Sequence, residues 1–140
     1  MNIVEVMLKL GLAEPNGADK EQIEACQQKL YHAKRALIPL GYMHFLQKSN
    51  GVQTDTLSLF GIQNEQSGFV RDIFEVNTIA GTTDDSDQIF LGDNFKEYLA
   101  YSWAEKCYLV MDKKTLNIAK KFPLFDHAMV YFLRDYIEKA

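Results

Sequence analysis

The sequence has 140 residues, of which 47% are hydrophobic and 24% are charged. These values fit a single globular domain and exclude a disordered, collagenous or coiled-coil chain. Fifteen Lys and Arg against nineteen Asp and Glu give a net charge of −4, which repels a phosphate backbone, so we expect no nucleic-acid partner. No apolar run approaches the ~20 residues that a membrane-spanning helix needs, and we expect no membrane association.

The N-terminal residues and the cysteines both favour a cytoplasmic protein. Glu5 stands where a signal peptide carries only positive charge, and no small-residue cleavage site follows. Cys26 and Cys107 are the two cysteines of the chain, too few for a four-thiolate metal site. Their apolar neighbours predict reduced, buried thiols, as is usual in the cytoplasm.

The first part of the chain predicts three helices. Apolar residues at helical spacing mark one face of a short first helix: Ile3, Val6, Met7 and Leu10. Asp19 and Gln22 have the spacing of a capping box, so an amphipathic helix is expected over 20–37. Pro39 suits the first turn of a third helix, which Asn50-Gly51 would end.

The middle of the chain predicts strands. Residues 57–62 indicate a short one, while residues 69–80 stay ambiguous because Ile73 and Val76 also have helical spacing. Four further runs have strand character: 89–92, 97–103, 107–112 and 117–122. Their links are short enough to join neighbouring antiparallel strands, so residues 89–122 are expected to form a β-meander.

A C-terminal helix is expected over residues 126–138. Asp126 is its predicted N-cap, and Phe125 and Val130 occupy the positions of a hydrophobic staple. The buried stripe of this helix is expected to contain Met129, Val130, Leu133, Tyr136 and Ile137. Periodicity along the chain places five large residues in the core: Leu46, Leu99, Trp103, Val110 and Leu133.

Helices, then a meander, then a helix define an α+β fold: an antiparallel β-meander sheet flanked by N-terminal helices and a C-terminal helix. We expect one domain over residues 1–140, with 1–36 as an N-terminal helical segment and 37–140 as the core. The run of consecutive antiparallel strands argues against a doubly wound nucleotide-binding fold.

The sequence lacks the motifs that carry catalysis. The eight glycines form no phosphate-binding loop, no serine lies in a nucleophile elbow, and the three histidines lack the spacing of paired metal ligands. A calcium loop beginning at Asp85 would need Gly and Glu at the positions that Phe90 and Lys96 occupy. We therefore expect no catalytic, cofactor-binding or metal-binding residues, and a protein that is not an enzyme.

One segment has an unusual charge. Residues 72–95 contain no Lys or Arg and six acidic residues: Asp72, Glu75, Asp84, Asp85, Asp87 and Asp93. Two interpretations have equal weight, a solvated loop that keeps the protein soluble and a docking surface for a basic protein partner. On either, Asp84, Asp85 and Asp87 are expected to be exposed. Tyr98, on a predicted strand, is a further candidate anchor for a partner if it points outward.

A series of motifs over residues 36–135 is similar to that of a known superfamily. A proline-led helix with Tyr42 and Phe45-Leu46 closes in Asn50-Gly51. The motifs that follow it, in order, are Leu59-Phe60-Gly61, Asp72-Ile73-Phe74-Glu75-Val76-Asn77, Phe90-Leu91-Gly92-Asp93, Glu97-Tyr98-Leu99-Ala100-Tyr101 and Tyr108-Leu109-Val110-Met111-Asp112. Their order and spacing resemble the SUKH superfamily, closest to its YrhA-like branch. The run Asn94-Phe95-Lys96 departs from the family pattern, in which extra glycines or acidic residues are common here.

The resemblance implies a binding module. Bacterial members of the superfamily mostly resemble cytosolic immunity proteins that bind polymorphic toxins, many of them nucleases, and the family has no universal catalytic set. The function that the resemblance implies is neutralisation of a toxin, such as a basic nuclease domain, by stoichiometric occlusion. The alternative is a housekeeping adaptor or regulatory protein-binding domain similar to the yeast cell-wall-synthesis regulator that gives the superfamily its name. The sequence leaves the oligomeric state open.

Overall fold

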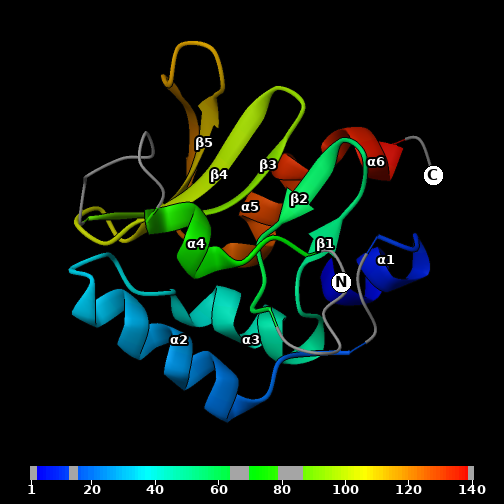
Figure 1. Cartoon of the computed structure of the whole chain (residues 1–140). Helices are drawn as coiled ribbons and strands as arrows, with labels where there is room; N and C mark the ends of the chain where they lie inside the picture. Colours follow the sequence, from blue (N-terminus) through cyan, green and yellow to red (C-terminus); the bar gives the residue numbers. More distant parts are fainter. Residues whose placement is uncertain (1–2, 13–15, 64–69, 79–86, 139–140) are drawn as a thin grey trace.

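The computed structural model describes residues 3–12, 16–63, 70–78 and 87–138. Within them, six strands form one antiparallel sheet whose strand order follows the chain (Figure 1). The strands are Val52–Gln53 (β1), Leu57–Leu59 (β2), Gln88–Asn94 (β3), Glu97–Ser102 (β4), Cys107–Asp112 (β5) and Ile118–Phe122 (β6). The predicted α+β class and the antiparallel meander are confirmed. The sequence does not predict β1, because two residues are too few to show alternation.

The described residues also form six helices, which lie mainly on one side of the sheet. They are Ile3–Lys9 (α1), Lys20–His32 (α2), Leu40–Lys48 (α3), Ile73–Thr78 (α4), Phe125–Phe132 (α5) and Arg134–Glu138 (α6). In Figure 1, α2 and α3 lie side by side below the sheet, and α5 contacts β5 and β6. None of the helices in the described ranges is both long and apolar enough to cross a membrane.

Alternation along the central strands supplies apolar residues to both faces of the sheet. Leu99 and Val110 are fully buried in the main core, to which the helices contribute. Ala100 and Leu109 neighbour them in β4 and β5 and belong to a smaller cluster. Because successive side chains of a strand point to opposite faces, this second cluster lies on the other face.

Four of the five predicted core residues are fully buried, and the fifth is not. Leu46, Leu99, Val110 and Leu133 are each 0% exposed. Trp103 is 40% exposed, so its predicted burial is wrong. The strand β4 ends at Ser102, which leaves Trp103 in the turn that follows, outside the strand alternation. Burial of Cys26 and Cys107 as free thiols is confirmed.

The second helix begins where the sequence predicts and ends earlier. Gln22 N donates to Asp19 Oδ1 at 2.7 Å, and Asp19 N donates to Gln22 Oε1 at 3.0 Å, which confirms the capping box. The helix ends at His32 rather than at residue 37. Lys34 adopts a φ of 59°, and the backbone amides of Lys34 and Arg35 donate back to the last helical turn, which stops the helix.

The predicted C-terminal helix is two helices, α5 and α6, separated at Leu133. The residue at the N-cap of α5 is Leu124, which makes no side-chain cap bond, so the assignment of Asp126 as N-cap is wrong. Val130 is 50% exposed and does not belong to the buried stripe, although Met129 and Leu133 do.

Two motif residues of the sequence join separate parts of the chain through buried hydrogen bonds. The Tyr42 hydroxyl lies within hydrogen-bonding distance of the carbonyl oxygens of Phe60 and Leu91. Asn50 Nδ2 donates to Ile62 O, and Ile62 N donates to Asn50 Oδ1, both at 2.7 Å. These bonds fix α3 and the segment after it against the residues that follow β2.

Other motif residues have the same structural role. Asn77 Nδ2 donates to Phe90 O at 2.9 Å, and Phe90 N donates to Asn77 Oδ1 at 2.8 Å, which fixes α4 to β3. A Cβ at Gly61 would lie 2.4 Å from the carbonyl oxygen of Asn50, so only glycine permits this approach of the backbones. Because these motif residues hold the fold together, a functional surface is to be sought among other residues.

Candidate functional site

The predicted acidic surface is only partly present in the described residues. Asp84 and Asp85 lie outside them. Asp72 accepts hydrogen bonds from the backbone amides of Gln63 and Glu75, at 3.0 and 3.1 Å, and so holds the start of α4 in place. Glu75 itself is exposed. Within the described ranges, the carboxylate of Glu75 faces solvent, whereas the carboxylate of Asp72 is occupied by these two backbone amides.

Asp87 and Asp93 are occupied by contacts within the fold. Asp87 is half-buried rather than exposed as predicted, because its carboxylate accepts from Ser102 Oγ at 2.7 Å and from the backbone amide of Ala104. Asp93 Oδ2 lies 3.3 Å from both Arg71 Nη1 and Lys113 Nζ. Arg71 directly precedes the acidic segment, and Lys113 comes from the turn after β5. Both cations neutralise part of the charge of the segment, which the local count of residues 72–95 does not show.

Tyr98 is half-buried on the face of the sheet that carries the smaller cluster. Its ring centroid lies 5.4 Å from that of Phe90, and Lys113 Nζ lies 5.4 Å from the Tyr98 ring centroid. The alternation therefore places the side chains of Tyr98 and Leu99 on opposite faces of the sheet, as predicted. The Tyr98 ring nevertheless packs against other residues of the protein instead of projecting freely into solvent.

The structure brings together aromatic residues that are far apart in the sequence. Neighbouring ring centroids are 4.8–6.0 Å apart along the row Trp103, Tyr101, Tyr108, Phe125 and Phe45. The row runs from the exposed Trp103 at the β4–β5 turn to α5 and α3. Rings at these separations stabilise one another beyond simple burial. Burial raises the pKa of the Tyr108 hydroxyl, so this member of the row is neutral at physiological pH.

Gly41 sets the distance between α3 and this aromatic row. A Cβ at Gly41 would lie 2.7 Å from the Tyr108 hydroxyl oxygen and 2.8 Å from Phe125 Cβ. Only glycine therefore allows α3 to pack this closely against α5 and β5. Leu40, next to Gly41, is 62% exposed, and Leu124, next to Phe125, is 58% exposed. Trp103 lies beside the same region, since its indole Nε1 donates to Leu37 O at 2.8 Å.

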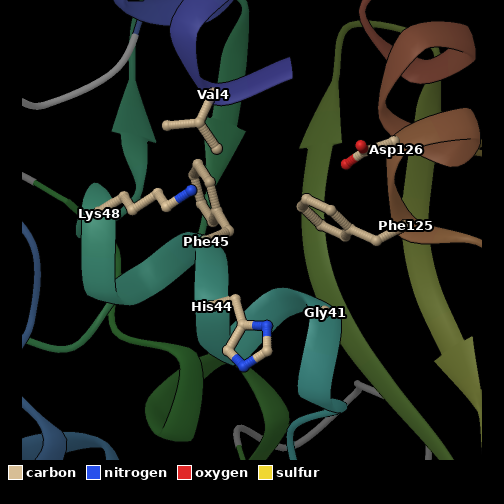
Figure 2. Close-up of a pocket in the computed structure, with 7 residues that line it drawn as sticks. All are labelled: Val4, Gly41, His44, Phe45, Lys48, Phe125 and Asp126. Carbon is tan, nitrogen blue, oxygen red and sulfur yellow. The ribbon is translucent and has the colours of Figure 1, made fainter. Parts of the chain in front are cut away.

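A groove of about 450 Å³ opens between α3 and α5; Figure 2 shows its lining residues. We call it the α3–α5 groove; Val4, Phe45 and Phe125 form its apolar part, and Gly41, His44, Lys48 and Asp126 complete the lining. Its volume lies in the ~300–1,000 Å³ range of ligand pockets. In Figure 2 the Phe45 and Phe125 rings lie on opposite sides of the gap.

The rim of the α3–α5 groove carries opposite charges on its two sides. Lys48 and His44 come from α3, and Asp126 comes from the first turn of α5. All three side chains are exposed, and within the described ranges none of them is hydrogen-bonded or ion-paired to another residue. An apolar gap with free charges at its edge can hold an apolar side chain of a partner and orient the polar groups beside it.

Sequence reasoning missed this groove. Phe45 and Phe125 each have the pattern of a core residue, and only the packing of α1, α3 and α5 in three dimensions creates the recess that they line. The sequence feature that could have indicated the groove is Gly41, because a glycine inside a helix often marks close packing against another element.

The described ranges contain no group of three or more His, Cys, Asp or Glu side chains that could hold a metal ion. No protein-family model matches the chain, and no curated protein matches it.

Proposed function

We propose that the protein is a binding module that neutralises a toxin domain by covering it, with the α3–α5 groove as its docking surface. The observation that carries the proposal is the exposure of Leu40 and Leu124, which adjoin the groove-lining residues Gly41 and Phe125 in the chain. The exposed Trp103 is bonded to Leu37 O, shortly before α3. Exposed Trp and large apolar residues around a recess are typical of the centre of protein interfaces, where few residues supply most of the binding free energy.

The occupant that fits the groove is an apolar side chain of the partner, flanked by a polar group of each sign. An acidic group would face Lys48 and His44 on α3, and a basic group would face Asp126 on α5. The net charge of −4 favours association with a basic partner by long-range attraction. The toxin part of the proposal rests on the resemblance to the SUKH superfamily.

The first test is genomic position: a reading frame directly upstream of this chain that encodes a toxin domain would support the immunity function, and that domain is then the partner used below. Co-expression with the chain should restore growth, and the purified proteins should form a one-to-one complex. Leu40→Asp should weaken that complex by at least about 30-fold, the effect expected of an interface anchor. An acidic residue in the first turn of α3 is compatible with the helix, so the variant should stay folded.

The matched control is Tyr31→Asp, which changes a 66% exposed aromatic residue near the end of α2, whereas Leu40 directly precedes the groove-lining Gly41 on α3. It should bind as the wild type does. Equal binding by Leu40→Asp and wild type would place the interface elsewhere. Specific binding to a partner that is not toxic would favour the adaptor alternative over the immunity function.

A further inference from the structure

The strand β6 forms one edge of the sheet, and its surface differs from that of the interior strands. It pairs with β5 on one side, and no described strand pairs with its other side. Four of its five residues are exposed. Such an edge presents backbone N–H and C=O groups that an added strand can use.

The turn before β6 carries an exposed leucine in an unfavourable conformation. Leu116 has a φ of 61° and is 59% exposed. A left-handed conformation costs free energy for a residue with a branched side chain, and Gly or Asn would avoid that cost. Because the side chain is largely exposed, burial of apolar surface supplies little free energy to offset that cost. Leu116 belongs to neither hydrophobic cluster of the described residues, so its side chain does not contribute to the core, which points to a role outside the fold.

The exposed lysines of the same hairpin favour a partner strand of negative charge. Lys114 and Lys120 are exposed and make no ion pair within the described ranges, while Lys121 is paired with Glu105 at 2.6 Å. Lysines on an edge strand oppose pairing with a second copy, because like charges would lie across from each other. The same lysines favour an acidic strand.

We propose that β6 accepts an extended acidic segment of a partner protein as a seventh strand, with Leu116 and Ile118 contacting its apolar side chains. Ile118 is 42% exposed and lies opposite Met111 of the smaller cluster, so an added strand would cover it. This inference goes beyond the α3–α5 groove and stands whether or not that groove binds a toxin.

The test uses a synthetic peptide of about eight alternating Val and Glu residues, long enough for one strand. Backbone resonances of the full chain are followed by NMR during titration, together with amide hydrogen exchange. The peptide should protect amides of Ile118–Phe122 from exchange, and a peptide with Lys in place of Glu should bind at least about fivefold more weakly. Protection at β1 instead, equal binding of both peptides, or protection that grows with protein concentration before any peptide is added would overturn the proposal.

Two variants separate charge from packing. Lys120→Glu should reverse the preference between the two peptides, whereas Lys20→Glu, an exposed position at the start of α2, should leave it unchanged. Leu116→Gly should raise the urea midpoint of unfolding because it removes the conformational cost, yet it should weaken binding of the acidic peptide. A purely structural role for Leu116 predicts that stability and binding fall together, and that result would refute its part in docking.

Discussion

Glu97 and Arg134 form a two-point ion pair between β4 and α6. Arg134 Nη1 donates to Glu97 Oε1 at 3.1 Å, and Arg134 Nη2 donates to Glu97 Oε2 at 3.0 Å. Glu97 is 6% exposed, so the free-energy cost of burying its charged carboxylate must be offset by the positive charge of Arg134. The break between α5 and α6 at Leu133 lies one residue before Arg134, and the pair holds α6 at the end of the sheet where β3 turns into β4.

Removal of the arginine should therefore be costly. Arg134→Met should lower the free energy of unfolding by about 3–5 kcal/mol, because it leaves a buried carboxylate without its cation. The control is Lys96→Met, which breaks the exposed pair of Lys96 Nζ with Asp135 Oδ2 at 3.0 Å and should cost at most about 1 kcal/mol. Urea titrations of both variants check the difference. Equal small losses would mean that solvent reaches Glu97 and compensates its charge.

The packing of α5 can be tested by comparing Val130, inside the helix, with Leu133, the residue that ends it. Leu133→Ala should cost about 2–5 kcal/mol, because Leu133 is 0% exposed and its truncation leaves a cavity. Val130→Ala should stay within about 0.5 kcal/mol, since Val130 is 50% exposed. The free energies of unfolding in urea test both. Similar costs for the two variants would contradict the orientation of α5.

The features that the sequence predicts well are those with local causes. The capping box of Asp19 and Gln22 depends on residues three apart, and the predicted bounds of β5 are confirmed because a continuous apolar run fills the strand. The order of the strands followed from the short links between them. Each of these signals lies within a few neighbouring residues, where backbone geometry and alternation decide the outcome.

The features that the sequence missed depend on distant contacts. Trp103 has strand alternation in sequence, but its indole bonds to Leu37 at the surface. Asp87 belongs to an acidic run, yet Ser102 and Ala104 hold its carboxylate. The α3–α5 groove exists because Phe45 and Phe125 meet across it. None of these partners is near in the chain, so no local pattern could have identified them.

Asp87 lies in an acidic segment whose composition suggests a solvated loop, but its hydrogen bonds to Ser102 and Ala104 indicate a structural role. Asp87→Ala should lower the free energy of unfolding by about 1–3 kcal/mol, because Ser102 Oγ and the Ala104 amide lose their acceptor. Glu75→Ala removes the same charge from the exposed face of α4 and should stay within about 0.5 kcal/mol. Thermal and urea unfolding compare the two. A loss that is the same for both variants would indicate a general charge effect.

We expect the buried Cys26 thiol to make the free energy of unfolding fall at alkaline pH. Burial, with a smaller effect of the Asp72 charge, raises its pKa from 9.0 to about 12. Because the folded state keeps the proton more tightly than the unfolded state, the stabilisation is fully present below pH 9.0 and is lost as the pH rises from 9.0 towards 12. Cys26→Ala should remove this dependence, although its cavity lowers stability at every pH.

The measurement is the free energy of unfolding in urea at about pH 8 and pH 10 for wild type and Cys26→Ala. Between these values the wild type should lose about 1.4 kcal/mol more than the variant, which is the linkage expected when only the unfolded thiol ionises. Burial also raises the pKa of Tyr42 and of Tyr108, but both proteins retain these tyrosines, so their contribution cancels in the comparison. Identical losses in the two proteins would show that the Cys26 thiol ionises as readily in the folded chain as in the unfolded one.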